Sequence, residues 1–241
     1  TDIMCLLEVF GAHLNVDPYI FSLLYPGKVL EEICNEDKKN IYLKKLINGS
    51  KISYCFSEPG QRYDHTKVNS RVKANNNKYY INGKKNFVLA SNLSDYILFP
   101  TKSDDNLIYL FIFEKNNNSL VSNFYKTIDD SYAFDYEFNN LELQDSNLLA
   151  TVSYDVFKNK IEYINDFITL ACCTDALGII EKMYELTLDY VKTREQFGKK
   201  IGSFQVVQHR MVEMYIKKEE MRSLNYMGQL ALQENTNITD R

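Results

Sequence analysis

The spacing of apolar residues changes twice along this chain and divides it into three blocks. From Asp2 to about Leu46 they recur every three or four residues, the spacing of amphipathic helices. From Ile52 to about Leu149, short runs rich in Tyr, Phe, Val and Ile alternate with clusters of Asn, Asp, Gly and Ser, which is typical of strands joined by turns. From about Asp155 the helical spacing returns. The pattern predicts an α+β protein with an N-terminal helical domain (residues 1–50), a middle β domain (51–153) and a C-terminal helical bundle (154–241).

The middle block predicts an antiparallel barrel or sandwich, because roughly seven short strands follow one another at a spacing of about 8 to 12 residues. The dipeptide Asn82-Gly83 predicts a type I′ hairpin turn between Tyr80-Ile81 and the following strand. Strands do not alternate with helices here, and no GxGxxG or Walker spacing occurs among the glycines. A dinucleotide would therefore have to bind at a site without a glycine-rich phosphate loop.

The last block predicts two helices of about 30 residues, which pack antiparallel because a short turn joins them. Cys172 and Cys173 lie within the helical pattern of the first of these helices, and we expect both to be buried, unreactive thiols. The first residues already have the pattern of a helix interior, and the last have no clear cap. We therefore expect the chain to be truncated at both ends, a piece of a longer protein.

Composition narrows the classes of partner. A net charge of −4 and a pI near 5.5 argue against nucleic acid, which requires a basic surface. Neither a run of 18 apolar residues nor a basic amphipathic helix is found, so no membrane partner is expected. Five cysteines without CxxC spacing indicate neither a disulfide framework nor a metal site, and the three widely separated histidines are interpreted as structural.

The strongest local signal is the stretch from Asp189 to Arg210. It places Arg194, Phe197 and Gln205 around a glycine turn. An Arg fork suits a phosphate or a carboxylate, an aromatic face suits a flat ring, and a side-chain amide suits the polar edge of a nucleotide. This combination is a plausible nucleotide clamp. The alternative is an αα-hairpin whose Arg pairs with a surface carboxylate and whose Phe belongs to the core.

The order of the three blocks and three local motifs resembles the acyl-CoA dehydrogenase family. The motifs are YCFSEPG (Tyr54–Gly60), YYINGKKNFV (Tyr79–Val88) and REQFGKKIGSFQ (Arg194–Gln205). The stretches EPGQRYDHTKV and DALGIIEKMYELTLDYVKTREQFGKKIGSFQVVQHR look similar to the pimeloyl-CoA dehydrogenase small-subunit group. The resemblance runs from end to end of the chain.

The resemblance implies an FAD cofactor lying between the β domain and the C-terminal bundle. By position, Tyr54, Phe56 and Ser57 would lie against the isoalloxazine, with Ser57 or its backbone hydrogen-bonding the ring. Phe87 would lie on the other side of the flavin; the alternative for Phe56 and Phe87 is a place in the sheet core. The pyrophosphate and adenine portion, that of a partner subunit, would be held by Arg194, Phe197 and Gln205.

Three positions depart from the family pattern near the expected ligands. Leu89 stands where many members have a hydroxyl that bonds flavin N5. Arg62 and Tyr63 replace the small residues of the family's G-S-D turn, and both are candidate substrate-binding residues. Arg62 could meet a CoA phosphate or a carboxylate-tipped acyl chain, or it could be a solvated surface residue.

The resemblance implies that the catalytic base is missing from this chain, because most members carry the catalytic Glu in a later C-terminal region that the chain lacks. Ile168 occupies the position at which some members carry a catalytic Glu, and an aliphatic group cannot take a proton. Asp175 lies two helical turns further along the same face and is the candidate base, with a buried Asp paired to an Arg as the alternative. Glu162 and Asp166 are further candidates.

The resemblance therefore implies a subunit of an FAD-dependent acyl-CoA dehydrogenase, in a homo- or hetero-oligomer. It would abstract the α proton of an acyl-CoA thioester, transfer the β hydride to flavin N5 and pass electrons to an electron-transfer flavoprotein. The expected location is the bacterial cytoplasm or the mitochondrial matrix. One alternative, favoured by Leu89 and Ile168, is a non-catalytic partner subunit that completes a neighbour's FAD site through Arg194 and Gln205. Another is a flavin oxidase on the same fold.

Overall fold

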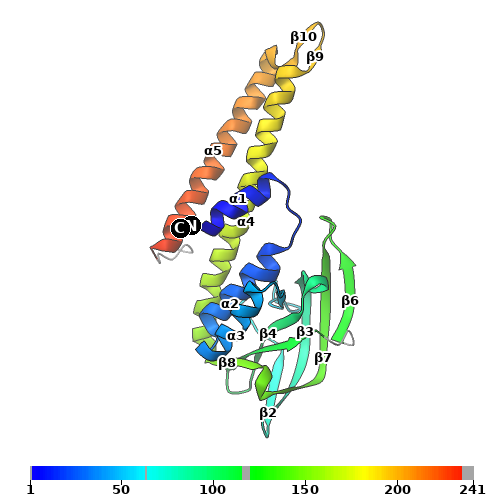
Figure 1. The fold of residues 1–241 in the computed structure, drawn as a ribbon, viewed down its shortest axis with the longest axis vertical. Coiled ribbons are helices and arrows are strands. Elements are labelled where there is room, and N and C mark those ends of the chain that lie inside the picture. The colour runs from blue at the N-terminus through cyan, green and yellow to red at the C-terminus, as the bar shows by residue number, and fades with distance from the viewer. Residues whose placement is uncertain (1, 63, 116–119, 235–241) are drawn as a thin grey trace. The chain divides into compact units, whose positions relative to one another are not determined.

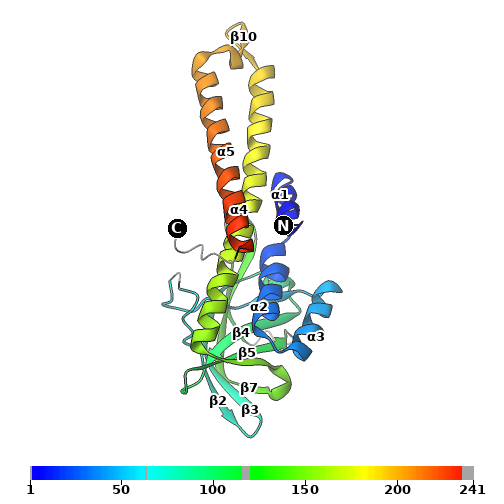
Figure 2. The ribbon, with the colours of Figure 1, turned by 90° about the vertical axis from the view of Figure 1, so that its left-hand side faces the viewer.

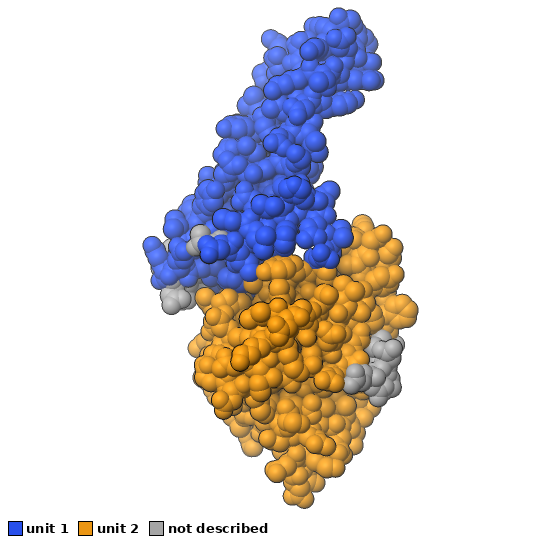
Figure 3. Space-filling model, in the orientation of Figure 1, with its two compact units in different colours: residues 1–17, 166–241 blue, residues 18–165 orange. Residues whose placement is uncertain are grey.

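The computed structural model describes residues 2–62, 64–115 and 120–234. Helices come first, strands follow and long helices end the chain, so the predicted α+β element order is confirmed. The chain divides into two compact units, one formed by residues 1–17 with 166–241 and the other by residues 18–165 (Figure 3). The boundaries of the three predicted domains stay a prediction.

Among the described residues of the sheet unit (18–165), a π-helical turn, two helices and eight strands precede the first turns of a long helix, α4 (Tyr154–Thr193). The helices are α2 (Tyr25–Ile33), which continues the turn at Ile20–Leu24, and α3 (Glu36–Ile47). The strands are β1 (Ile52–Tyr54), β2 (Arg71–Asn75), β3 (Lys78–Leu89), β4 (Tyr96–Lys102), β5 (Leu107–Glu114), β6 (Val121–Lys126), β7 (Tyr132–Gln144) and β8 (Leu148–Ser153). They form one sheet in the order β6-β7-β3-β2-β4-β5-β8, with β1 paired to β4.

Neighbouring strands of this sheet are mostly antiparallel, as predicted; among the described strands, the β1–β4 and β2–β4 pairs are parallel. Its core is aromatic: the Phe99 ring lies 4.8 Å from the Phe138 ring and 6.0 Å from the Phe111 ring. All three side chains are at most 1% exposed. This packing gives the sheet a rigid interior on which surface segments can be held.

The hairpin turn predicted at Asn82-Gly83 is wrong. Both residues lie inside the continuous strand β3, and the turn is made by Asn76 and Asn77, which have φ of 48° and 61°. Strand pairing confirms a two-residue loop, since Asn75 faces Lys78. Two positive φ values are what a type I′ turn requires, and Asn tolerates them. Gly83 has a different role, because a Cβ there would lie 2.4 Å from the Ser70 hydroxyl oxygen.

Within the sheet unit, polar side chains fasten helices α2 and α3 to later segments of the chain. The Tyr25 hydroxyl donates to Asn165 Oδ1 at 2.5 Å, and the Lys160 ammonium donates to the Glu32 carbonyl. Lys38, on α3, donates to the Leu148 carbonyl. Figures 1 and 2 show α2 and α3 beside one another on the sheet. The first two contacts fix α2 against the first turns of α4, and the third fixes α3 against β8.

The helical unit (1–17 and 166–241) contains α1 (Asp2–Ala12), the rest of α4 and α5 (Gln205–Gln233). Helices α4 and α5 run antiparallel, as predicted, and the short strands β9 (Glu195–Gln196) and β10 (Lys199–Lys200) join them (Figures 1 and 2). With 40 residues, α4 is longer than predicted, while α5 has 29. By length and composition alone α4 could cross a membrane, a property that core helices of soluble proteins share.

Helix α1 crosses α4 at a pair of glycines. A Cβ on Gly11 would lie 1.9 Å from the Asp175 carbonyl oxygen, and a Cβ on Gly178 would lie 1.9 Å from the Glu8 carbonyl oxygen. The two backbones therefore touch, and no other residue type fits at either position without moving a helix. Nearby, the buried Thr174 and Asn225 side chains hydrogen-bond each other between α4 and α5 at 3.0 Å.

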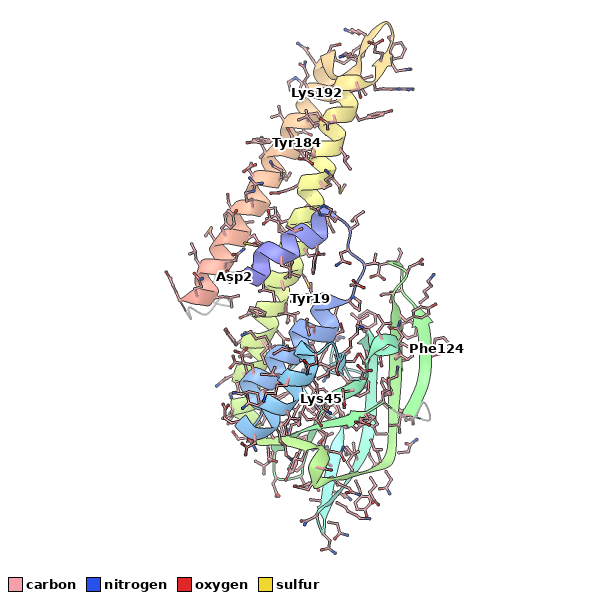
Figure 4. All side chains as sticks on the ribbon, viewed as in Figure 1. Asp2, Tyr19, Lys45, Phe124, Tyr184 and Lys192 are labelled. Atoms are coloured by element: carbon pink, nitrogen blue, oxygen red, sulfur yellow. The ribbon has the colours of Figure 1, made fainter. Side chains whose placement is uncertain are left out.

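The predicted apolar face of α4 is covered in its first half only. Ile161, Ile164 and Ile168 are buried, whereas Met183 and Leu186 are 57% and 59% exposed. Tyr184 and Lys192 mark this exposed half in Figure 4. Cys172 is exposed and Cys173 is half-buried, so the expected burial of both thiols is wrong. Sequence periodicity identifies an apolar face but not how much of it is covered.

Candidate functional site

The turn Ser57–Gly60 and strand β3 are joined by two reciprocal hydrogen bonds. The Ser57 hydroxyl donates to Asn86 Oδ1 at 3.0 Å, and the Asn86 backbone N–H donates to the Ser57 carbonyl at 3.0 Å. Both residues are half-buried. The turn of the first motif and the strand of the second motif therefore form one surface, although 29 residues separate these two side chains in sequence.

Directly beside this contact lies a buried ion pair. The Lys85 ammonium meets the Glu58 carboxylate at 2.5 Å, with side-chain exposures of 0% and 1%. The same carboxylate accepts the backbone N–H of Ser70 at 3.1 Å, and Lys85 also donates to the Pro100 carbonyl at 2.8 Å. Burial lowers the pKa of Lys85, and the Glu58 charge opposes that shift. Removing one partner would leave a charged group buried without its counter-ion.

Phe87 projects from a β-bulge in the same strand. The register between β3 and β7 shifts between Lys85 and Val88, and Phe87 has a φ of 53°. Its backbone N–H donates to Asp135 Oδ1 at 3.1 Å, and its side chain is 42% exposed. Bulges next to binding sites re-aim a side chain, and a bulky residue at positive φ persists only where its surroundings hold it. Phe87 is therefore displayed at the surface and does not belong to the sheet core.

Aromatic side chains lie beneath the Ser57 turn. Tyr54 is 4% exposed and packs edge-on against Tyr25, with ring centroids 5.0 Å apart. Phe56 stacks on Tyr25 at 5.3 Å and lies 4.6 Å from the His65 ring. Burial raises the pKa of Tyr54 well above its usual range. The Tyr54 and Phe56 rings thus pack on the same Tyr25 ring, and a contact of Tyr54 with a flavin stays a prediction.

Three further residues were singled out in the sequence, namely Arg62, Tyr63 and Leu89. Arg62 is exposed in the loop after the turn and has a φ of 56°. Tyr63 lies outside the described residues. Leu89 is half-buried, and its carbonyl accepts the Ser53 hydroxyl at 3.0 Å. A role of Arg62 in substrate binding stays a prediction.

In the helical unit, the clamp motif forms a tight hairpin tip. Gln196 pairs with Lys199, and the two residues between them, Phe197 and Gly198, have φ of 57° and 76°. A type I′ turn requires positive φ at both central residues, a conformation for which Gly198 is suited and Phe197 is not. Phe197 is 92% exposed and meets the Phe204 ring edge-to-face at 6.2 Å. The alternative that this Phe is ordinary core is wrong.

Cationic and amide side chains lie on the same hairpin as Phe197. The Lys199 ammonium lies 4.3 Å from the Phe204 ring centroid, and Arg194 and Gln205 are exposed at the two ends of the hairpin. Within the described part of the chain, no carboxylate forms an ion pair with Arg194. The tip therefore offers a guanidinium, an aromatic face and an amide to a ligand, the groups that suit a nucleotide.

The candidates for a base lie on α4. Ile168 is 6% exposed, so its position is part of the packed interior. Asp175 is half-buried, and burial raises the pKa of its carboxyl. Among the described residues no Arg pairs with Asp175, so the alternative of an Asp–Arg pair is not supported. Glu162 is exposed and faces Lys158 at 3.9 Å.

Four residues that build this surface were missed from the sequence: Glu58, Lys85, Asn86 and Asp135. A signal for one of them was present. Lys85 follows Ile81 and Gly83 at the two-residue period of the inward face of β3, and a charge on an inward face requires a partner. For Asn86 and Asp135 there was no such signal, because their roles depend on the bulge and on strand register.

Comparison with known proteins gives consistent matches. Residues 169–238 match the model of the acyl-CoA dehydrogenase C-terminal domain. Isovaleryl-CoA dehydrogenase of Pongo abelii is 28% identical over 233 residues, which cover 90% of this chain and 51% of that protein. Short/branched chain specific acyl-CoA dehydrogenase of Bos taurus is 25% identical over 83% of this chain and 48% of its own length. The chain thus spans about half the length of the curated relatives it matches.

Solved structures share the fold. A glutaryl-coenzyme A dehydrogenase in complex with glutaryl-CoA has a TM-score of 0.81 at 20% identity, covering 95% of this chain and 60% of that chain. A glutaryl-CoA dehydrogenase from Mycobacterium smegmatis in complex with FADH2 has a TM-score of 0.74 at 20% identity, covering 88% of this chain and 55% of that chain. At these identities the likeness concerns the fold.

Proposed function

We propose, from the premise that this chain belongs to the acyl-CoA dehydrogenase family, that it is part of an FAD-dependent acyl-CoA dehydrogenase subunit. The observation that carries the proposal is Phe87, an aromatic ring displayed from a strained bulge beside the coupled pair Ser57 and Asn86. Strained, exposed aromatic residues cost free energy and are kept where a ligand uses them. The groups present fit a flavin ring.

Ser57, Asn86 and Phe87 are the residues that would hold the isoalloxazine. The Ser57 hydroxyl donates to Asn86, so its lone pairs remain to accept a hydrogen bond from the ring. The exposed Phe87 side chain offers an apolar face for the flat ring and excludes water from it. FAD, when bound, supplies the hydride acceptor for the β carbon of an acyl-CoA thioester.

Arg194, Phe197 and Gln205 would hold the pyrophosphate and adenine portion of FAD, in our proposal that of a neighbouring subunit. Phe197 is 92% exposed on a tip held by a two-residue turn, which suits stacking on an adenine ring. The Arg194 guanidinium is exposed and suits a pyrophosphate. This role requires an oligomer, homomeric or heteromeric, and an electron-transfer flavoprotein would accept the electrons.

No catalytic base is assigned among the described residues, and Asp175 is retained only as a candidate, half-buried on α4 where burial raises the pKa of its carboxyl. A second function rests on a different observation. Ile168 is packed and aliphatic at the position where a catalytic Glu stands in some relatives, and this favours a non-catalytic partner subunit that completes a neighbour's FAD site. Arg62 is retained as a candidate contact for a CoA phosphate or an acyl carboxylate, and the oxidase remains an alternative that differs in oxygen reactivity.

The test is an absorbance spectrum of the full-length protein, purified alone and with the product of the neighbouring gene. An acyl-CoA is then added under anaerobic conditions. Bleaching of the flavin band by the protein alone supports a self-sufficient dehydrogenase, and flavin only in the pair supports the partner subunit. Absence of flavin from both contradicts the proposal.

Variants of the tip sharpen this test. We expect Arg194→Ala and Phe197→Ala to reduce the flavin content of the oligomer. Arg210→Ala is the matched control, because Arg210 is also exposed on this hairpin but is paired with Glu213 at 2.8 Å. Equal flavin content in Arg194→Ala, Phe197→Ala and Arg210→Ala would contradict the proposed contact.

A further inference from the structure

We infer that Glu58 and Lys85 are positioning residues for the flavin ring: their buried ion pair aligns the Ser57 turn with strand β3 and so holds Ser57, Asn86 and Phe87 in place. The inference rests on the proposed function and goes beyond it. It assigns a role to two residues that do not themselves present a side chain at the surface.

The ion pair fixes the register of the Ser57 turn against strand β3. Glu58 directly follows Ser57, and Lys85 directly precedes Asn86. The ion pair and the Ser57–Asn86 hydrogen bonds therefore connect the same two backbone segments, one link buried and one half-buried. A slip of either segment by one residue would break both links together.

The Glu58–Lys85 ion pair connects more than two segments of the chain. The Glu58 carboxylate also accepts backbone N–H groups of Asn69 and Ser70, ahead of β2, and the Lys85 ammonium reaches the Pro100 carbonyl on β4. Four stretches of chain thus converge on one pair of charges. Apolar residues of similar volume are often as stabilising as a buried ion pair. They would not, however, orient the four chain segments through hydrogen bonds as this pair does.

The backbone of Phe87 is strained. The φ of 53° at Phe87 is unfavourable for a bulky residue, and such conformations persist only where neighbours hold them from both sides. Asp135 holds Phe87 on one side, through the backbone N–H. Two residues before Phe87, Lys85 is held by Glu58. The Ser57–Asn86 hydrogen bonds are a further support, and they depend on the same alignment. Loss of the pair should therefore let the bulge relax.

The test begins with hydrogen exchange of the full-length protein without added FAD. We expect Lys85→Met to speed exchange in the peptide that covers Asn86 and Phe87, at least tenfold more than in peptides from β5. Lys78→Met is the matched control, since Lys78 lies on the same strand in an exposed pair with Glu142 at 2.6 Å. Unchanged exchange at Asn86 and Phe87 in a folded Lys85→Met protein would overturn the inference.

A double variant separates positioning from general stability. Glu58→Gln/Lys85→Met carries no buried charge, so we expect it to recover much of the melting temperature lost in Lys85→Met. The local exchange at Asn86 and Phe87 should stay fast, because the alignment is still missing. Recovery of slow exchange together with the melting temperature would show that the pair acts on stability only, and would overturn the inference.

The flavin provides the last measurement. In the oligomer, we expect Glu58→Gln/Lys85→Met to bind FAD more weakly and to alter the visible circular dichroism of bound flavin, whereas Lys78→Met leaves both unchanged. If the wild-type protein binds no flavin, the proposed function fails and so does a positioning role toward the ring, but exchange still reports whether the pair aligns the segments. If the wild type binds flavin and the double variant has the same affinity and dichroism, only the inference fails.

Discussion

The two units bury their apolar side chains to different extents. In the sheet unit Phe99 and Phe111 are fully buried, while on the helical hairpin Met183, Leu186 and Leu224 are 57% to 64% exposed. The sheet is thus stabilised by a filled core. The helical unit is stabilised by narrower contacts, among them the glycine crossing between α1 and α4 and the Thr174–Asn225 hydrogen bond between α4 and α5. The two units should therefore respond differently to the same kind of substitution.

The largest difference is expected for truncation of apolar side chains. Phe99→Ala should lower the free energy of unfolding of the sheet unit by about 3–5 kcal/mol, because it leaves a cavity among fully buried rings. Leu224→Ala should change stability by less than ~0.5 kcal/mol, since this side chain is 64% exposed. Thermal unfolding followed by circular dichroism would measure both. Similar costs for the two variants would contradict the comparison.

A smaller effect, of opposite sign in the two units, is expected for glycine. Gly178→Ala should destabilise the packing of α1 on α4 by roughly 1–3 kcal/mol, because its Cβ would meet the Glu8 and Ala12 backbones. Gly27→Ala should stabilise α2 by about 0.5–1 kcal/mol, since its Cβ would only touch Leu46 at 3.8 Å. Exchange rates of α1 and α2 amides would report each change locally. A stabilising Gly178→Ala would show that the crossing is loose.

The smallest effect is a pH dependence of the helical unit. Burial and the neighbouring Glu181 raise the pKa of Glu8, and Arg222 opposes them. The folded state therefore binds this proton more tightly than the unfolded state. The stability that Glu8 contributes is complete below its ordinary pKa of 4.5 and is lost as pH rises through the raised value.

Glu8→Gln should accordingly match the wild type near pH 4 and be more stable than it near pH 7. The melting temperatures of the two proteins at both pH values would check this. Glu213→Gln, on α5 in an exposed pair with Arg210, controls for the loss of a carboxylate. If Glu8→Gln were no more stable at pH 7, the proximity of Glu8 to Glu181 would not affect folding.

Much of the fold could be predicted because periodicity is a local property of the sequence. The change in spacing near Gly49 and again near Asp155 matches the end of α3 and the start of α4 within a few residues. The hairpin turn could not be placed in the same way. Both Asn76-Asn77 and Asn82-Gly83 consist of residues that tolerate the positive φ of a type I′ turn. Only the pairing of β2 with β3 and the close approach of Ser70 to Gly83 decide between them.

For the candidate site, the motifs identified which segments matter but not which side chains face outward. Tyr54 and Phe56 look alike in sequence, yet Tyr54 is buried and Phe56 is half-buried. Phe87 is exposed only because a bulge shifts the register of β3 against β7. Burial and bulges depend on contacts between residues far apart in the chain, and the spacing within one motif does not contain that information.

The position of Asn82 and Gly83 inside β3 also bears on how the protein ages chemically. In a flexible loop, the backbone nitrogen of a glycine after asparagine attacks the side-chain amide, and the asparagine deamidates. Here Asn82 faces Arg71 of β2, Gly83 faces Phe138 of β7, and the Asn140 N–H donates to Asn82 Oδ1 at 2.8 Å. The paired strand keeps the nitrogen and the amide carbon from approaching each other, so the Asn-Gly sequence that is most prone to this damage is protected where it stands.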